Sequence, residues 1–390
     1  MTMDIFVVAS DPGCANALSS VIATCCKQGH NINGVVSVGA AALLSKQWPE
    51  IKEIDDSTTI DKILNIWQRN KPKILLSGAG AYNLLEQTVR LAAKEVNIPC
   101  VAVLDYWANY QERFRRREGK EWVYSIPDRI CVLDEIVKNE MLAERFSPET
   151  IVATGQPYFE YISNWINTLS PKDINLFRNR FMKDEKTLLI GFCSEPIAED
   201  LEMMHNDEIG YTQYTILSNV APLLKRLAES RSIGIHLVVR PHPREENRNL
   251  KEILAQMQSS STFTWEVSKI GSSLEFALSC DLLIGMTSMA LIEAIIMSCN
   301  VLSIQLNLNK KDVFFGTTRG CCPSVYTDKE LSNWLQNWLI GQKNNLRKFE
   351  PRFNTMLYKS GASQHVITIM EEMIEKSSLS SQSSQVTETI

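Results

Sequence analysis

The stretch GIHLVVRPHPREEN, residues 234–247, joins an apolar run to a charged segment through a histidine flanked by two prolines. The mostly apolar run 234–239 is typical of a strand covered on both faces of a parallel sheet. Proline has no amide N–H and a fixed φ, so Pro241 and Pro243 end the strand sharply and hold His242 in place. We therefore expect His242 at the carboxyl end of a strand, where open α/β sheets bind ligands.

Similar apolar runs alternate with helical patterns along most of the chain. In the first half, this alternation predicts strands at 4–10, 33–38, 73–77, 100–104 and 129–133, with helices at 14–28, 59–69, 82–96 and 135–145. In the second half, it predicts strands at 187–192, 234–239, 262–266, 281–284 and 300–304, with helices at 211–229, 245–258, 272–279 and 287–299. Strand–helix alternation of this kind predicts an α/β protein with two Rossmann-like domains that face a cleft.

The alternation breaks near residues 151–185, which suggests a domain boundary. We expect an N-terminal Rossmann-like acceptor domain at 1–155 and a linker at 156–186. A C-terminal Rossmann-like domain would follow at 187–376, with closing helices near 328–341 and 361–375. The Ser-rich, apolar-poor segment 377–390 predicts a disordered tail.

Bulk properties exclude several classes of protein. The net charge of −5 over 390 residues argues against a nucleic-acid binder, which would carry a basic bias. The ten cysteines show no metal-ligand spacing and the N-terminus shows no secretory leader, so we expect reduced thiols, a cytoplasmic protein and no metal. The longest apolar stretch, 289–306, is interrupted by Glu293 and Asn300, which argues against a membrane-spanning helix.

The segment Arg240-Pro241-His242-Pro243-Arg244 is the first candidate site. An imidazole can donate a hydrogen bond to a phosphate or protonate a leaving group near neutral pH. Arg240 and Arg244 would add positive potential. The alternative is that the prolines only end a strand and that His242 caps the next helix.

A second candidate site follows the predicted strand 281–284, where Gly285, Thr287 and Ser288 precede a helix. Backbone amides at a helix N-terminus bind anions, and the two hydroxyl groups can add hydrogen bonds. Glu293, in the otherwise apolar helix, could accept hydrogen bonds from a ribose diol. The alternative is ordinary helix capping by Thr287 or Ser288 and a structural role for Glu293.

Two aspartates follow strands in the first half and are candidate catalytic bases. Asp11 lies in SDPGCAN, residues 10–16, where a turn of small residues enters a helix and leads to Asn16. Asp105 begins the segment 105–114, which mixes aromatic and polar side chains. Alternatively, Asp11 only starts a turn.

The segment after Asp105 suits a sugar or another polar acceptor, because rings stack on apolar sugar faces while polar groups bond hydroxyls. Its candidate acceptor-binding residues are Trp107, Asn109 and Arg113. The basic run of Arg113 and Arg115–Arg117 could hold an anionic acceptor. The alternative is a packed aromatic hinge with a solvated basic face.

The remaining histidines offer no better base. We expect His30 at the surface in a turn, His205 in a polar loop, His236 within a strand and His365 in the last helix. No P-loop, G-x-S-x-G elbow or G-x-G-x-x-G turn is present.

Together these motifs resemble those of the GT-B glycosyltransferase superfamily. The resemblance is nearest to its bacterial capsule, teichoic-acid and sialic-acid branches and to UDP-N-acetylglucosamine 2-epimerases. It covers roughly residues 1–375, as architecture and short motifs. The motifs that carry it are Thr154-Gly155-Gln156-Pro157, Arg240-Pro241-His242-Pro243, the helix start with Thr287, Ser288 and Glu293, and Lys359-Ser360-Gly361-Ala362-Ser363.

The resemblance implies a glycosyltransferase of surface-polysaccharide or related glycoconjugate synthesis. Asp11 or Asp105 would deprotonate the acceptor hydroxyl, and His242 would contact the donor phosphate or assist departure of the nucleotide. No cofactor beyond the nucleotide-sugar substrate is implied, and a peripheral contact with a membrane is compatible with this function. The implied donor-binding residues are Arg240, His242, Thr287, Ser288 and Glu293, and a glycan or other hydroxyl acceptor would lie near Asn16, Trp107, Asn109 and Arg113.

Three other functions stay open on the same fold. One is a nucleotide-sugar 2-epimerase or hydrolase, although the acidic motifs of those epimerases find no match here. Another is a polyol-phosphate transferase, although teichoic-acid-type enzymes place a catalytic histidine in the N-terminal domain and this sequence offers no good candidate. The third is a ligand-binding protein without catalysis.

Overall fold

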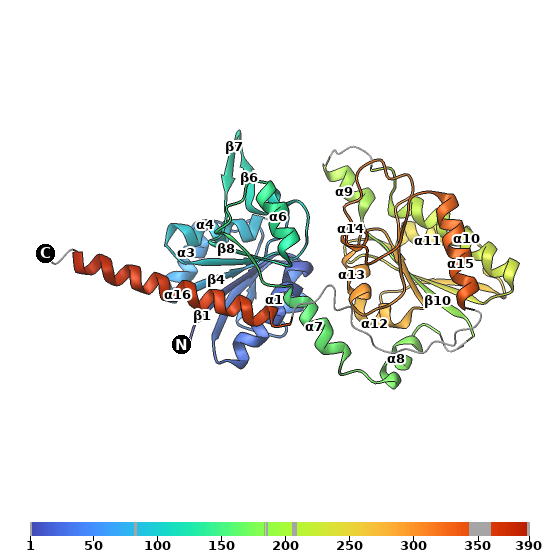
Figure 1. The fold of residues 1–390 in the computed structure, drawn as a ribbon, viewed down its shortest axis with the longest axis horizontal. Helices are drawn as coiled ribbons and strands as arrows, with labels where there is room; N and C mark the ends of the chain where they lie inside the picture. The colour runs from blue at the N-terminus through green and yellow to red at the C-terminus, as the bar shows by residue number, and fades with distance from the viewer. Residues whose placement is uncertain are drawn as a thin grey trace. The chain divides into compact units, whose positions relative to one another are not determined.

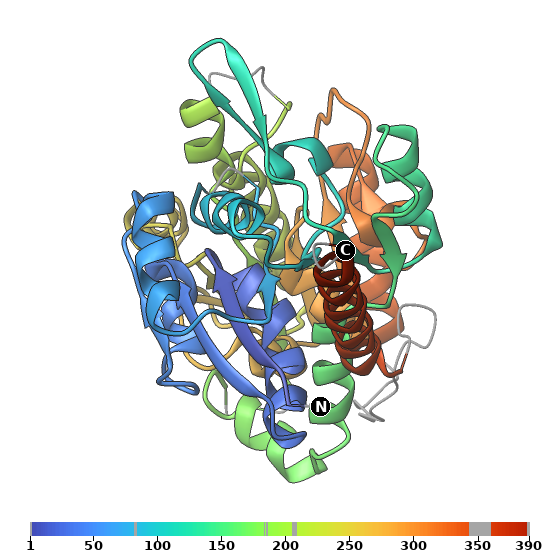
Figure 2. The ribbon, with the colours of Figure 1, turned by 90° about the vertical axis from the view of Figure 1, so that its left-hand side faces the viewer.

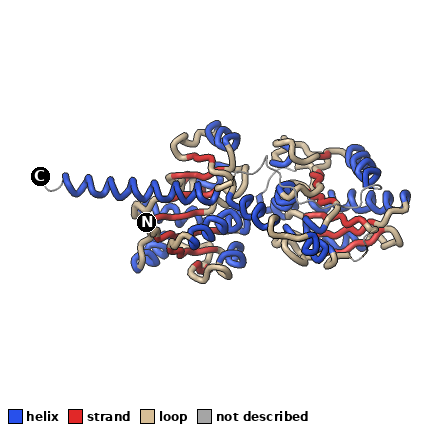
Figure 3. The backbone as a smooth tube through the Cα atoms, turned by 60° about the horizontal axis from the view of Figure 1, so that its bottom comes forward, coloured by secondary structure: helices blue, strands red, loops and turns tan. Residues whose placement is uncertain are grey.

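The computed structural model describes residues 2–81, 84–182, 184, 186–204, 209–342 and 360–387. The chain divides into two compact units, which we call unit 1 (Met1–Tyr161 with Tyr358–Ile390) and unit 2 (Ile162–Leu357). Each unit contains one parallel sheet with helices packed on it (Figure 1, Figure 3). The predicted pair of Rossmann-like α/β layers is therefore confirmed.

The sheet of unit 1 has seven parallel strands in the order β3-β2-β1-β4-β5-β8-β9. The direction of winding reverses between β1 and β4, which makes the carboxyl ends of these two strands the expected ligand position. The strands are β1 (Asp4–Ala9), β2 (Asn31–Val36), β3 (Ile51–Glu53), β4 (Ile74–Ser77), β5 (Cys100–Val103), β8 (Arg129–Val132) and β9 (Ile151–Ala153).

Alternate residues of β1 enter two separate apolar layers. Ile5 and Val7 pack with α1, whereas Phe6 and Val8 pack with α3 and α4. Burial on both faces explains why the strand reads as a continuous apolar run. The helices of unit 1 are α1 (Pro12–Lys27), α2 (Val38–Leu44), α3 (Ile60–Arg69), α4 (Leu84–Glu95), α5 (Tyr110–Phe114), α6 (Glu135–Ala143), the start of α7 (Pro157–Ile166), and α16 (Ala362–Thr387).

The last helix, α16, differs from its predicted place. It was expected in the C-terminal domain, but it belongs to unit 1 and lies along α1 (Figure 1). Val366, Ile367 and Met370 are fully buried in the same apolar cluster as α1. Apolar burial therefore decides where this helix lies. The helix continues as far as Thr387, so most of the segment 377–390, which was expected to be disordered, is helical.

A two-stranded antiparallel hairpin stands apart from the large sheet of unit 1. It consists of β6 (Arg115–Glu118) and β7 (Glu121–Tyr124), joined by Gly119 and Lys120. Gly119 has φ +61°, which favours glycine at this tight turn. Charged residues dominate the hairpin, so its sequence lacks the alternation of apolar and polar residues that predicts a strand.

Unit 2 repeats the doubly wound plan with six parallel strands in the order β12-β11-β10-β13-β14-β15. Its reversal of winding lies between β10 and β13. The strands are β10 (Leu188–Cys193), β11 (Ile235–Arg240), β12 (Phe263–Val267), β13 (Leu282–Gly285), β14 (Val301–Ile304) and β15 (Ser324–Val325). The helices are α8 (Pro171–Arg178), α9 (Ile197–Met204), α10 (Gln213–Arg231), α11 (Asn247–Ala255), α12 (Ser273–Ser279), α13 (Met289–Ile296), α14 (Phe315–Thr318) and α15 (Asp328–Gln342).

The expected linker, 156–186, contains the helices α7 and α8, and the boundary between the units falls inside α7. Short elements such as α2, β3, β9 and β15 were not predicted, because they hold too few residues for a periodic pattern. Within the described part of the chain, no helix is both long and apolar enough to cross a bilayer. His205 and Lys359 lie outside the described residues.

Candidate functional site

His242 lies in the loop that follows β11, as predicted. The carboxylate of Glu245 accepts a hydrogen bond from the backbone N–H of His242 at 2.7 Å, which fixes the loop. The backbone N–H of Arg244 donates to Nδ1 of His242 at 3.2 Å. Because Nδ1 is an acceptor, the neutral ring carries its proton on Nε2.

The environment of His242 keeps its ring neutral. Burial first, and the nearby charge of Arg244 second, lower the pKa of His242 to about 4. A ring with this pKa is uncharged near pH 7. A neutral His242 is suited to donate a hydrogen bond from Nε2, and its role in the departure of a leaving group stays a prediction.

The guanidinium groups of both arginines in this loop form hydrogen bonds within the chain. Arg240 donates to the carbonyl oxygens of Ile270 and Gly271 at 2.9 and 2.7 Å, which holds the loop after β12. Arg244 forms a bidentate pair with Asp200, with distances of 2.9 and 3.1 Å. Arg240 thus positions a neighbouring loop, and its predicted contact with the nucleotide-sugar donor stays a prediction.

A carboxylate of the chain occupies the predicted anion site at the start of α13. Glu195, directly after β10, accepts from the backbone N–H groups of Met286 and Thr287 at 3.2 and 2.8 Å. Its other oxygen accepts from the Thr287 hydroxyl at 2.7 Å. Burial raises the pKa of Glu195, and the hydrogen bonds from Thr287 and Met286 oppose that rise. Amides and a hydroxyl that can bind a phosphate are thus already bound to a carboxylate.

Ser194 and Glu195 connect the two motifs that the sequence singled out. The hydroxyl of Ser194 donates to Glu245 at 2.8 Å on the His242 side, while Glu195 binds Thr287 on the other side. The two motifs are not on adjacent strands, since β10 lies between β11 and β13. Neither residue was predicted from the sequence, although a Ser-Glu-Pro after an apolar strand was a usable signal.

Ser288 and Glu293, also predicted to bind the nucleotide-sugar donor, lie beside and in α13 respectively. The Ser288 hydroxyl oxygen accepts from the backbone N–H of Ala290 at 3.1 Å and so caps the helix. Glu293 is buried within α13, with 4% of its surface exposed. Capping by Ser288 was the alternative weighed from the sequence, and a ribose contact of Glu293 stays a prediction.

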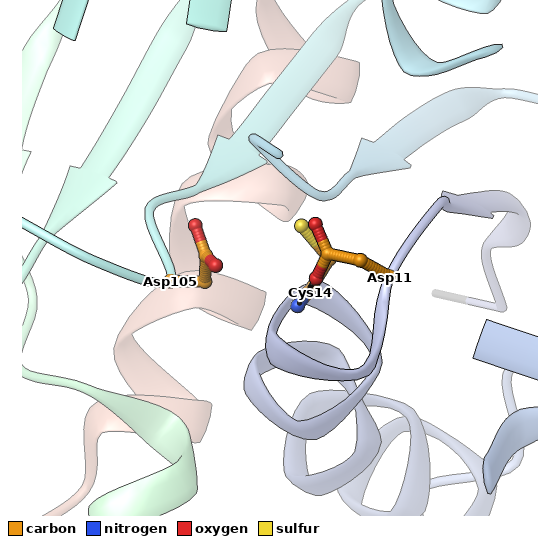
Figure 4. Close-up of side chains that lie close together, drawn as sticks. All are labelled: Asp11, Cys14 and Asp105. Atoms are coloured by element: carbon orange, nitrogen blue, oxygen red, sulfur yellow. Dashed lines mark hydrogen bonds between the residues drawn. The ribbon is translucent and has the colours of Figure 1, made fainter. Parts of the chain in front are cut away.

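In unit 1, Asp11 and Asp105 are brought together at the carboxyl edge of the sheet. Figure 4 shows Asp11 and Cys14 at the start of α1 with Asp105 opposite them. Asp11 caps α1 by accepting from the backbone N–H of Cys14 at 2.8 Å. An added Cβ on Gly13 would lie 2.7 Å from an oxygen of Asp105, and one on Gly80 would lie 2.7 Å from an oxygen of Asp11. The glycines therefore leave room for the two carboxylates.

Glu86 on α4 is a third carboxylate of this site and was not predicted from the sequence. It is fully buried and accepts from the backbone N–H of Ser10 at 3.0 Å and of Gly80 at 2.6 Å. These amides follow β1 and β4, on either side of the reversal of winding. Burial first, and the nearby charge of Asp11 second, raise the pKa of Glu86 to about 7. In the sequence it resembles any polar residue of an amphipathic helix.

Two buried arginines support these acids. Arg113 pairs with Asp105 at 2.5 Å and donates to the carbonyl oxygens of Ala79 and Ala108. Arg90 donates to the Arg113 carbonyl at 2.7 Å and to the Ser77 hydroxyl at 3.0 Å. The buried guanidinium of Arg113 orients Asp105, and its predicted contact with the acceptor stays a prediction. Burial raises the pKa of Asp105, Arg113 opposes the rise and Asp11 adds to it.

The potential ligand atoms of Asp11, Cys14 and Asp105 lie within 4.8 Å of one another. Their chemistry suits a metal ion poorly. Asp105 already pairs with Arg113, and burial raises the pKa of Cys14 well above its usual range, which disfavours the thiolate that a metal needs. We therefore interpret the group as a carboxylate site.

The predicted acceptor residues differ in their exposure. Asn16 is half-buried on α1, and Asn109 is exposed in a left-handed conformation with φ 56° before α5. Trp107 is buried, and its ring packs against Phe159 with centroids 5.7 Å apart. The packed aromatic hinge that was the alternative interpretation thus describes Trp107, and sugar stacking by this ring is not supported.

A scan of protein-family models and a search of curated proteins give no match to this chain. Solved structures do match. UDP-GlcNAc 2-epimerase from Methanocaldococcus jannaschii aligns with a TM-score of 0.66 and 13% identity, over 95% of this chain and 100% of that one. The Neisseria meningitidis UDP-GlcNAc 2-epimerase, solved with UDP-GlcNAc bound, aligns with a TM-score of 0.65 and 14% identity. The alignment covers 95% of this chain and 100% of the epimerase.

MurG from Acinetobacter baumannii also aligns, with a TM-score of 0.52 and 13% identity over 95% of this chain and 99% of MurG. At these identities the matches establish the fold. The chain therefore has the GT-B fold, with two Rossmann-like units, that it shares with UDP-GlcNAc 2-epimerases and MurG.

Proposed function

We propose that the protein is an enzyme acting on a nucleotide-activated sugar, with the nucleotide bound by unit 2. The observation that carries the proposal is the set of polar loops at the reversal of winding in unit 2, where His242, Ser194 and Thr287 lie on neighbouring strand ends. The neutral His242 would donate from Nε2 to a phosphate oxygen. The fold shared with enzymes named for UDP-GlcNAc supports the same assignment.

Glu195 adds a condition to nucleotide binding. A diphosphate that approaches the start of α13 meets a carboxylate already bound to Met286 and Thr287. Two negative charges cannot share these donors without a large cost. We infer that Glu195 is displaced or protonated when a phosphate binds there.

Unit 1 would provide proton transfer. Asp11 and Asp105 lie together at the sheet edge, and Asp105 is oriented by Arg113. Because burial raises the pKa of Asp105, this carboxylate is a stronger base than an exposed one. We propose Asp105 as the general base and Asp11 as its neighbour that raises the basicity further.

The reaction that we propose first is glycosyl transfer to a hydroxyl acceptor. Its test begins with calorimetry of UDP, CDP, CMP and GDP, each titrated into the full chain. Binding of one nucleotide, weakened by His242→Ala, is the expected result. If none binds, and a broad panel of nucleotide sugars and acceptors shows no turnover, the proposed function is wrong.

A nucleotide-sugar 2-epimerase or hydrolase is the second candidate. It is favoured by the higher structural similarity to the epimerases than to MurG, with TM-scores of 0.66 and 0.52. NMR of nucleotide sugars incubated without acceptor separates the two reactions. Turnover without acceptor, lost in Asp105→Asn, would select the second candidate.

A polyol-phosphate transferase loses support from the position of His30. The expected surface position of His30 is wrong, since only 9% of it is exposed. Its Nδ1 accepts from the backbone N–H of Met3, at the start of β1 and β2. This is the edge of the sheet opposite the carboxyl ends, so His30 cannot serve the site of Asp11 and Asp105.

A further inference from the structure

The hairpin β6–β7 sorts its side chains onto two chemically different faces. In its register Arg115 lies opposite Tyr124 and Arg117 lies opposite Trp122. Residues directly opposite each other in an antiparallel pair share a face. We call the set of Arg115, Arg117, Trp122 and Tyr124 the arginine–aromatic face.

The other face carries the acidic residues and is attached to the unit. It holds Glu118 opposite Glu121, and Arg116 opposite Val123. Arg116 donates to the Thr88 hydroxyl on α4 at 2.9 Å and pairs with Glu118 at 2.6 Å. Both acidic side chains of the hairpin strands are thus kept away from the arginine–aromatic face.

The arginine–aromatic face is open to solvent. Trp122 and Tyr124 are 45% and 47% exposed, and Ile126, two residues further, is 45% exposed. Figures 1 and 2 both show the hairpin standing out from the sheet of unit 1. Exposed large side chains that gather on one face mark an interaction surface, whereas isolated ones are ordinary.

The cations of this face are arranged around the Trp122 ring. The guanidinium carbon of Arg115 lies 4.4 Å from the ring centroid, and that of Arg117 lies 5.6 Å from it. Arg115 also pairs with Glu112 at 3.1 Å, so its charge is partly offset. Arg117 has no ion pair within the described residues, which leaves a net positive charge on the face.

We propose that the arginine–aromatic face docks the protein on an anionic membrane surface. Tryptophan and tyrosine prefer the headgroup region of a bilayer, where an apolar ring meets water, and arginine adds attraction to anionic lipids. The exposed aliphatic Ile126, two residues after the hairpin, suits a lipid surface better than a nucleic acid or a sugar, which would favour stacking rings alone. The proposal is independent of the reaction proposed above.

The negative net charge of the chain makes vesicle binding a specific test of the arginine–aromatic face. The net charge of −5 disfavours general attraction to an anionic bilayer, so binding must depend on this local face. Sedimentation of the full chain with vesicles tests it, using phosphatidylcholine alone and an equal mixture with phosphatidylglycerol. We expect binding to the anionic vesicles only, and we expect it to weaken as salt is raised.

Variants identify the face. Arg117→Ala should weaken vesicle binding about fivefold, the contribution of one basic side chain near an anionic surface. The matched control is Arg248→Ala, which removes the same charge from a side chain that is 82% exposed in unit 2 and should change little. Trp122→Ala combined with Tyr124→Ala should abolish binding, whereas Leu176→Ala, at a 60% exposed apolar residue, should not.

Thermal unfolding of each variant distinguishes loss of binding from loss of fold. The salt dependence is measured on the unmodified chain, so it does not depend on whether a variant folds. Failure of the unmodified chain to sediment with anionic vesicles would overturn the proposal. So would equal losses in Arg117→Ala and Arg248→Ala. Binding to heparin or a single-stranded oligonucleotide through the same residues, without vesicle binding, would assign the face to a soluble polyanion instead.

Discussion

At the scale of single residues, each unit places an internal carboxylate on backbone amides at its reversal of winding. Glu86 binds the N–H groups of Ser10 and Gly80 in unit 1, and Glu195 binds those of Met286 and Thr287 in unit 2. Buried amides need acceptors, and a carboxylate satisfies two of them at once. In unit 2 the same amides are those that a nucleotide would use.

Glu195→Ala should increase the affinity for the nucleotide that binds unit 2. Removing the carboxylate frees the donors of Thr287 and removes its repulsion of phosphate, which we expect to tighten binding about 10-fold or more. The affinity of the unmodified protein should also rise as pH falls, because burial raises the pKa of Glu195 and protonation removes its charge. Calorimetry at several pH values checks both effects.

The matched control is Glu246→Ala, which removes an exposed carboxylate before α11 that forms no side-chain cap bond. It should leave affinity nearly unchanged. Weaker binding in Glu195→Ala than in the unmodified protein would mean that Glu195 contacts the ligand directly.

Glu86 should make the stability of the protein depend on pH. Its pKa in the folded protein is raised to about 7 from 4.5, so the folded state holds a proton that the unfolded state releases. The resulting stability is full below pH 4.5 and is lost as pH rises through about 7, with a size on the order of 3 kcal/mol. Urea unfolding at pH 5 and pH 8 measures it.

Glu86→Gln should flatten this dependence, because glutamine does not titrate. Glu50→Gln, at an exposed residue, should retain it. A pH dependence that is equal in the two variants would show that Glu86 titrates normally.

At the scale of elements, the position of α16 depends on a surface that its own sequence does not reveal. The helix follows unit 2 along the chain, yet Val366, Ile367 and Met370 are fully buried in unit 1 beside α1. Glu160 on α7 also accepts from the backbone N–H groups of Gly361 and Ser363 at 2.9 and 3.0 Å, which fixes the start of α16. An amphipathic pattern predicts a helix but does not say which domain covers its apolar side.

Ile367→Ala should destabilise unit 1 by about 2–5 kcal/mol, the usual cost of emptying a fully buried aliphatic site. The control is Ile340→Ala on α15, where the side chain is 52% exposed and the change should be small. Urea unfolding of both variants, followed by hydrogen exchange in α1, gives the comparison. Unchanged exchange in α1 would contradict the packing of α16 on this helix.

At the scale of the whole molecule, the two units carry different parts of the proposed chemistry. Unit 2 contains the neutral His242 and the donors of Thr287, while unit 1 contains the acids Asp11 and Asp105. Each unit has its own sheet and its own apolar core. A ligand of one unit should therefore leave the secondary structure of the other intact.

A bound nucleotide should therefore slow hydrogen exchange in unit 2 at the loops after β10, β11 and β13. Exchange at the ends of β1, β4 and β5 in unit 1 should change much less with the nucleotide alone. His242→Gln should reduce the protection in unit 2. Protection confined to unit 1 would place the nucleotide on the other sheet and contradict the assignment.

The sequence by itself determined the α/β class, most strands and the loops that carry His242, Thr287, Asp11 and Asp105, because continuous apolar runs and the residues that end them are local signals. The tertiary structure alone decided which acids meet. Glu86 reaches Ser10 across 76 residues, and Glu195 reaches Thr287 across 92. It also decided the pKa values of His242 and Glu86 and the unit that holds α16. Burial and long-range contact produce these properties, and no pattern of neighbouring residues encodes them.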